Sequence, residues 1–164
     1  MQRARDILAG DLSGLPLGER WPYPATLDGL RMVAECQAGL VPESRPQAWL
    51  VLLDGVVIGE CGTSGPANEA GDVEIGYGLA APYRGLGVGT EMLVGLSRWL
   101  LAQDGVHRVT AGGVRADDIP SRRALERAGS SGTCPPRPER GTRCPRTVPH
   151  WFDRRRAAGR RRRR

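Results

Sequence analysis

A glycine-rich segment in the middle of the chain limits the fold most strongly. Arg84–Thr90 reads Arg-Gly-Leu-Gly-Val-Gly-Thr; it follows an apolar run and precedes a pattern with one apolar helical face. It is therefore predicted to be a tight turn from a strand into a helix. Glycines let main-chain N–H groups approach a ligand, and a helix N-terminus attracts phosphate. The turn is predicted to bind a pyrophosphate, with Arg84 adding a bidentate contact; alternatively, its glycines only shape the turn.

Composition excludes several classes of protein. All 24 basic residues of the 164 are arginines, so a P-loop ATPase and a lysine Schiff-base enzyme are excluded. The four cysteines have no CxxC spacing, which disfavours a zinc site or a disulfide scaffold, and no metal is expected. No apolar run approaches the length of a membrane span, and Met1–Gly10 has no apolar signal core. We therefore expect a cytoplasmic protein without membrane contact.

The charge separates the chain into two parts. Residues 1–130 carry 12 arginines and 16 acidic residues, a net charge of −4. Residues 131–164 carry 12 arginines and two acidic residues, a net charge of +10, and their only Leu, Ile, Val or Phe residues are Val148 and Phe152. Such a segment has too few apolar residues for a core. We therefore expect one folded domain over 1–130, and a disordered Arg/Pro-rich tail over 131–164 without a strand pair.

The remaining pattern predicts an α/β fold. Asp54-Gly55 between two apolar runs is a strong hairpin signal. Pro120 in the first turn of a helix and Gly129 just past its end predict the last helix, and Gly105 is expected to cap the central one. In chain order, helices are expected at Ala4–Leu8, Thr26–Ala38, after the glycine-rich turn and at Ile119–Ala128, and strands at Trp49–Leu53, Val56–Ile58, Val73–Leu79 and His107–Val114.

Three segments in this order resemble the GNAT family of N-acetyltransferases. Arg84, Gly87 and Gly89 match the family pattern R/Q-x-x-G-x-G/A, whereas the dinucleotide pattern GxGxxG is not met there. Asp72–Tyr77 resembles the central strand of the ribosomal-protein alanine acetyltransferase branch, and Asp118–Gly129 resembles the family's later helix. The resemblance covers about residues 26–129. It implies a mixed central sheet flanked by helices.

The resemblance also implies acetyl-CoA as co-substrate and a primary amine as acceptor. Acetyl-CoA would lie in the opening between the two central strands, and the amine would attack its thioester directly. Main-chain groups near Tyr77 and Leu79 would pair with the pantetheine arm and hold the thioester oxyanion. The pyrophosphate would meet the turn, whose residues are Arg84, Gly85, Leu86, Gly87, Val88, Gly89 and Thr90.

Three further residues are candidates for the chemistry. Glu74 is the expected general base, acting directly or through water; the alternative is a solvent-facing strand residue. Ser121 is a candidate proton donor to the CoA thiolate, or else an ordinary serine at a helix start. Asp118 replaces the family asparagine and cannot donate a hydrogen bond, so it either contacts CoA as an acceptor or only caps the helix. Trp21 and Tyr23 either line the acceptor site or anchor a loop.

Compared with the family, the chain is expected to lack strands at both ends. The expected pattern begins almost in a helix, and the change in composition after Gly129 resembles a gene read out of frame. A chain lacking its last strands would be marginal or inactive, and strand exchange with a second copy would repair it. The arginines of 154–156 and 160–164, with Trp151 and Phe152, instead suggest non-specific contact with nucleic acid or another polyanion.

Overall fold

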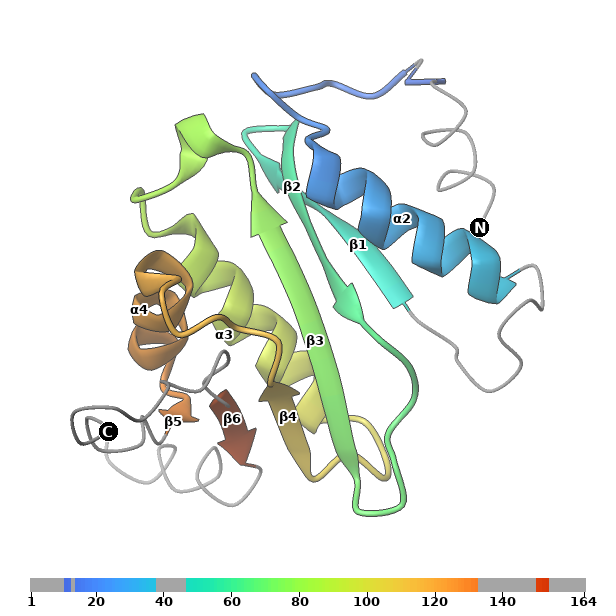
Figure 1. The fold of residues 1–164 in the computed structure, drawn as a ribbon, viewed down its shortest axis with the longest axis vertical. Helices are drawn as coiled ribbons and strands as arrows, with labels where there is room; N and C mark the ends of the chain where they lie inside the picture. Colours follow the sequence, from blue (N-terminus) through green and yellow to red (C-terminus); the bar gives the residue numbers. More distant parts are fainter. Residues whose placement is uncertain (1–10, 13, 38–46, 133–149, 154–164) are drawn as a thin grey trace, which may run out of the picture. The chain divides into compact units, whose positions relative to one another are not determined.

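The computed structural model describes residues 11–12, 14–37, 47–132 and 150–153 (Figure 1). The chain divides into two compact units. The first unit comprises Met1–Pro66 and Ile75–Leu86, and the second comprises Ala67–Glu74 and Gly87–Arg164. Strand β3 (Asp72–Leu79) contributes its first three residues to the second unit and its last five to the first. The helix expected at Ala4–Leu8 lies outside the described residues.

The first unit is built on a helix and an antiparallel hairpin. Helix α2 (Pro24–Gln37) contacts β1 (Gln47–Leu53), as Figure 1 shows. Asp54 (φ +50°) and Gly55 (φ +79°) join β1 to β2 (Val56–Thr63), and two positive φ angles are those of a type I′ turn. The predicted helix and hairpin are confirmed, although β2 continues to Thr63. A short 3-10 helix, η1 (Ala81–Tyr83), follows β3.

The core of the first unit lies where the start of α2 meets the sheet. Trp21, Leu30, Val57 and Ala80 are buried together there, and Leu27, Leu50 and Tyr83 pack against them. Ahead of α2, the described residues make one isolated parallel bridge, between Leu17 and Val57. Trp21 is only 4% exposed, which agrees with the loop-anchoring alternative for this residue.

The second unit combines a mixed sheet with two helices. Asp72–Glu74 of β3 pair in parallel with β4 (Arg108–Ala111), and α3 (Val88–Leu101) packs against β4 and α4 (Ile119–Ala128). Fully buried Leu93, Val109 and Leu125 fill its core. Following the hydrogen-bonded neighbours, the strand order is β1-β2-β3-β4-β6-β5. The predicted mixed sheet with flanking helices is therefore confirmed.

Two strands lie where the sequence predicted no strand pair. Strand β6 (His150–Asp153) pairs antiparallel with β4, and β5 (Ser131–Gly132) pairs antiparallel with β6. The prediction was wrong for these six residues because it counted apolar residues over the whole segment. Strand β6 forms by pairing with β4, and it buries the side chain of Phe152, which is 8% exposed. The other residues of 131–164 lie outside the described ranges.

Two predicted boundaries are also corrected. Helix α3 has its C-cap at Ala102, whose N–H donates to Arg98 O, so Gly105 is not the cap; it has φ +76° in the following turn. Strand β4 ends at Ala111 rather than Val114. In the described ranges, no helix has both the length and the apolar character needed to cross a membrane.

We predict that Phe152→Ala lowers the free energy of unfolding by about 3–5 kcal/mol, the usual cost of truncating a buried phenylalanine side chain to alanine. Urea denaturation followed by circular dichroism measures this change. Ile119→Ala is the matched control, because Ile119 is 42% exposed and should change stability by less than about 1 kcal/mol. Equal, small effects of the two substitutions would show that β6 does not contribute to the sheet.

Candidate functional site

The start of α3 presents main-chain donors. Gly87 precedes the helix with φ +88°, a left-handed conformation that favours glycine, and its carbonyl accepts from Thr90 N (3.0 Å) and Glu91 N (3.1 Å). The N–H groups of Val88 and Gly89 precede these bonds and have no carbonyl partner within the helix. Free donors in the first turn of a helix, together with the helix dipole, favour an anion at this position.

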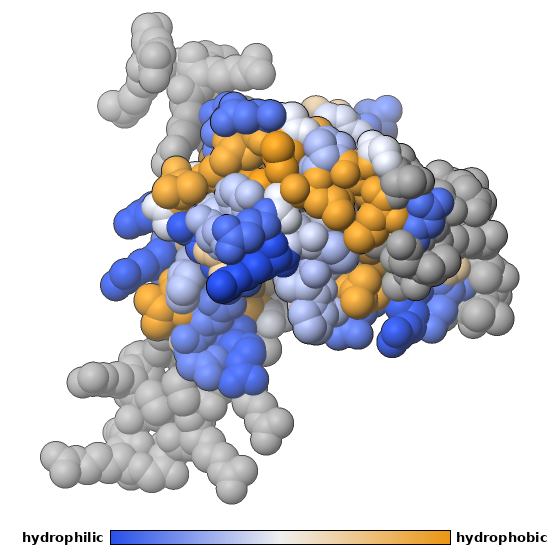
Figure 2. Space-filling model, turned by 90° about the horizontal axis from the view of Figure 1, so that it is seen from above, coloured by the Kyte–Doolittle hydropathy of each residue, from blue (hydrophilic) through white to orange (hydrophobic). Residues whose placement is uncertain are grey.

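Within the first unit, the residues just before this helix continue from the end of β3. Arg84 Nε donates to Leu79 O at 2.8 Å, so the base of its guanidinium group is fixed against the strand end. Gly85 has φ +80°, and Leu86 is 66% exposed. Figure 2 shows apolar areas beside hydrophilic ones on one face of the molecule. An exposed leucine in a predicted binding turn is consistent with contact to an apolar part of a ligand.

The C-terminal half of β3 has main-chain groups directed away from β2. The register pairs Gly59 with Leu79, and Ala80 N donates to Ile58 O at 2.8 Å. In an antiparallel pair, hydrogen-bonded and non-hydrogen-bonded residues alternate, so Tyr77 and Leu79 are at non-hydrogen-bonded positions. Their N–H and C=O groups therefore point away from β2. The bond from Arg84 to Leu79 O agrees with this orientation.

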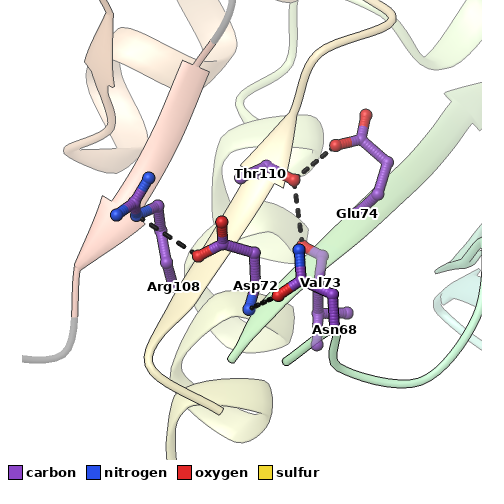
Figure 3. Close-up of polar contacts among 6 residues, drawn as sticks. All are labelled: Asn68, Asp72, Val73, Glu74, Arg108 and Thr110. Carbon is purple, nitrogen blue, oxygen red and sulfur yellow. Dashed lines mark hydrogen bonds and ion pairs between the residues drawn. The ribbon is translucent and has the colours of Figure 1, made fainter. Parts of the chain in front are cut away.

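In the second unit, Glu74 joins the ends of the β3–β4 pairing. Its Oε1 accepts from Gly112 N at 2.6 Å and from Gly113 N at 3.3 Å, and its Oε2 accepts from the Thr110 hydroxyl (Figure 3). The carboxylate thus binds donors that follow β4, which explains why β4 ends at Ala111. Glu74 is half-buried rather than a solvent-facing residue.

The Thr110 hydroxyl has two acceptors within reach. It lies 3.3 Å from Val73 O and is also hydrogen-bonded to Glu74 Oε2 (Figure 3). A hydroxyl group has one proton, so it donates to one of these oxygens at a time. If Glu74 took up a proton on Oε2, this O–H could donate to Thr110, and Thr110 could turn to Val73 O. Both protonation states of Glu74 would therefore keep a hydrogen bond.

The predicted residues on α4 form a helix cap. Asp118 is the N-cap, and its Oδ1 accepts from Ser121 N at 3.1 Å. Its carbonyl accepts from Arg122 N at the same distance, as expected for an N-cap residue. The capping alternative for Asp118 is therefore confirmed. Ser121 lies in the first turn of the helix and is half-buried.

A second carboxylate, missed by the sequence analysis, lies on β2. Glu60 Oε1 accepts from Tyr23 Oη at 2.5 Å, and Oε2 accepts from Trp21 Nε1 at 2.9 Å and Thr26 Oγ1 at 2.8 Å. Gly78 lies opposite Glu60 in the register. A Cβ on Gly78 would overlap the Tyr23 hydroxyl and come within 2.9 Å of Glu60 Oε1. The absence of a side chain at Gly78 thus allows this group to lie against β3.

Burial and the charge of Glu60 alter two neighbouring groups. Burial, followed by the hydrogen bond and the negative charge of Glu60, raises the pKa of Tyr23 well above its ordinary value. Tyr23 therefore remains a hydrogen-bond donor at neutral pH. Burial, with a smaller contribution from Glu60, raises the pKa of the Cys61 thiol to about 11. Cys61 is a neutral buried thiol rather than a reactive thiolate.

A family model described as an acetyltransferase (GNAT) domain matches residues 17–131. The chain belongs to the GNAT acetyltransferase family. The match covers most of the chain and includes the glycine-rich turn, both carboxylates and helix α4. It supports an N-acetyltransferase with acetyl-CoA as its co-substrate. No curated protein sequence is similar enough to the chain to be matched.

Solved structures share the fold of this GNAT chain at low sequence identity. An aminoglycoside acetyltransferase, AAC(6')-Ib, in complex with coenzyme A has a TM-score of 0.62 at 20% identity, covering 98% of this chain and 95% of its own. A chimera of the Vibrio cholerae spermidine N-acetyltransferase has a TM-score of 0.61 at 13% identity, covering 96% and 95%. A proposed ribosomal-protein-serine acetyltransferase from Vibrio cholerae has a TM-score of 0.59 at 13% identity, covering 93% and 88%. At these identities the likeness shows the fold alone.

We predict that Gly78→Ala lowers the free energy of unfolding by about 1–3 kcal/mol, because the new methyl group must displace the Tyr23 hydroxyl and the Glu60 carboxylate. Urea denaturation gives the value. Gly76→Ala is the control on the same strand, since a Cβ there meets nothing within 4 Å. If both variants were as stable as the wild type, the close approach at Gly78 would have no energetic importance.

Proposed function

We propose that this GNAT domain transfers the acetyl group of acetyl-CoA to a primary amine of a small molecule or a protein N-terminus by direct attack. The observation that carries this proposal is the orientation of β3, whose main-chain groups at Tyr77 and Leu79 point away from β2. A strand edge of this kind supplies donors and acceptors to an extended ligand. The pantetheine arm of acetyl-CoA has amide groups that suit it.

The pyrophosphate of acetyl-CoA is proposed to bind at the glycine-rich turn. The N–H groups at the start of α3 that have no carbonyl partner within the helix supply donors for phosphate oxygens, and the helix dipole favours the negative charge. Arg84 retains guanidinium nitrogens beyond the Nε that donates to Leu79 O, and these could contact phosphate. The proposed contact residues are Arg84, Gly85, Leu86, Gly87, Val88, Gly89 and Thr90.

Glu74 is proposed as the general base. The amine nitrogen attacks the thioester carbon, the carbon–sulfur bond breaks, and the amine gives up a proton to Glu74 Oε2 directly or through water. Thr110 and Val73 allow Glu74 to accept this proton without losing its hydrogen bond. N–H groups at Tyr77 or Leu79 are proposed to stabilise the oxyanion of the tetrahedral intermediate.

Helix α4 is proposed to assist the departure of the CoA thiolate. Ser121 would donate a proton to the CoA thiolate and regain one from water. Asp118 fixes the first turn of this helix through its bond to Ser121 N, so its proposed contribution to CoA binding is an indirect one. These two assignments rest on the family resemblance and on the half-buried position of Ser121.

An acetylation assay with Glu74→Gln tests the proposal. Purified chain is incubated with acetyl-CoA and a panel of amines comprising spermidine, kanamycin and peptides with a free N-terminus, and thiol release and product mass are measured. We expect wild-type turnover on at least one amine and a kcat about 10²–10⁴ lower for Glu74→Gln. Glutamine can keep the contacts of Glu74, because its amide oxygen can face Gly112 while its nitrogen faces Thr110.

The matched control is Glu69→Gln, which removes an exposed carboxylate of the same unit and should leave kcat unchanged. Acetyl-CoA affinity should be equal in all three proteins. If Glu74→Gln kept the wild-type kcat, Glu74 would have only a structural role, holding β4 through its hydrogen bonds. Absence of acetyl transfer to every amine, with acetyl-CoA bound, would contradict the proposed activity.

A further inference from the structure

Glu60 makes no ion pair within the part of the chain that the structure describes, although the positive charge of Arg84 reaches the Tyr23 hydroxyl of the same network. Among the described residues, no arginine lies within ion-pair distance of its carboxylate. Arg20 pairs with Glu19 and Arg31 pairs with Asp28, while Arg84 Nε donates to Leu79 O. The three donors of Glu60 are neutral groups. A half-buried carboxylate surrounded by neutral donors is a position that attracts a cation, since removing such a charge from water is costly without a counter-ion.

The carboxylate also has capacity for one more donor. Oε2 already accepts two hydrogen bonds, from Trp21 and Thr26, whereas Oε1 accepts only the one from Tyr23. A carboxylate oxygen accepts about two bonds. Oε1 is also the atom that lies near Gly78. The Tyr23 hydroxyl occupies the space over Gly78 itself, so a further donor would reach Oε1 beside this hydroxyl.

The position on β3 connects Glu60 to the reaction. Gly78 stands between Tyr77 and Leu79, the residues whose main-chain groups are proposed to meet the thioester. The amine that attacks the thioester must be neutral, but at neutral pH a second amino group of the same acceptor is mostly an ammonium ion. Of the two aromatic rings in this cluster, Trp21 is buried in the core and Tyr23 is half-buried, so the Tyr23 ring is the one that can face an ammonium group. The described residues of the first unit carry six carboxylates and three arginines, which also favours a cation.

We propose that Glu60, held by Trp21, Tyr23 and Thr26 against Gly78, binds a second, non-reacting alkylammonium group of the acceptor and so selects cationic amines such as polyamines. This inference rests on the proposed acetyl transfer for its place in the reaction. Binding of the cation itself does not require turnover. The competing role for Glu60 is structural: it would hold residues 21–26 against β2. Cation binding depends on the charge of Glu60, whereas the structural role depends on its hydrogen bonds.

Two substitutions separate these properties. Glu60→Gln removes the charge but can keep the network, because its amide oxygen can accept from Trp21 and Thr26 while its nitrogen donates to the Tyr23 oxygen. Glu60→Asp keeps the charge but is too short to keep all three bonds. Glu35→Gln is the control, since it removes an exposed carboxylate from α2 of the same unit.

The experiment is calorimetric titration of the full chain with spermidine at fixed ionic strength. We expect Glu60→Gln to weaken spermidine binding about tenfold or more, as for the loss of a hydrogen bond to a charged group. Glu60→Asp should bind within a few-fold of the wild type, although it should melt at a lower temperature. Glu35→Gln should match the wild type in both measurements.

Three results would overturn the inference: no spermidine binding by the wild type at millimolar concentration, unchanged binding by a folded Glu60→Gln, or loss of binding in Glu60→Asp equal to that in Glu60→Gln. If Glu60→Gln fails to fold, Gly78→Ala takes its place, because its methyl group must displace the Glu60 carboxylate; unchanged spermidine binding by folded Gly78→Ala would then overturn the inference. Acetyl-CoA titration of the same samples separates the proposals. Spermidine binding without acetyl-CoA binding would leave the cation site standing and remove the proposed acetyl transfer.

Discussion

The hydrogen bonding of β3 is the constraint on which the rest of the account depends. The first three residues of the strand pair with β4, and its last five pair with β2. Past Glu74, alternate main-chain groups are therefore directed away from β2. A carboxylate ends the pairing with β4 by taking the N–H groups of Gly112 and Gly113. The structure of the strand, more than any single side chain, thus creates an edge suited to an extended co-substrate.

The Glu74 and Glu60 carboxylates have similar hydrogen-bond environments that suit different roles. Each is a half-buried carboxylate on a strand, and each accepts hydrogen bonds from three neutral donors. Around Glu74, the Thr110 hydroxyl has a second acceptor, so a proton can be taken up without loss of a bond. Around Glu60, all three donors come from residues 21–26 and point to one carboxylate. The first arrangement suits proton transfer, whereas the second suits a fixed negative charge.

Local sequence signals predicted the parts of the fold that depend on local geometry. The Asp54-Gly55 turn and the helix between Asp118 and Gly129 follow from residue types with known turn and cap preferences. Strand β6 was missed because its four residues become a strand only by pairing with β4. The Glu60 network was missed because its donors lie 34–39 residues away in the sequence. Hydrophobic periodicity in a sequence does not indicate contacts between residues so far apart. The acidic residue inside an apolar strand was the only signal.

The most direct test of the central claim is the thermal unfolding of the full chain with and without acetyl-CoA. A ligand at about 100 times its Kd stabilises a folded binder by roughly 2.7 kcal/mol, which raises the Tm by several degrees. The account predicts such a rise, increasing with acetyl-CoA concentration. A cooperative transition whose Tm is the same at every concentration up to several millimolar would contradict the claim that β3 and the glycine-rich turn form an acetyl-CoA site.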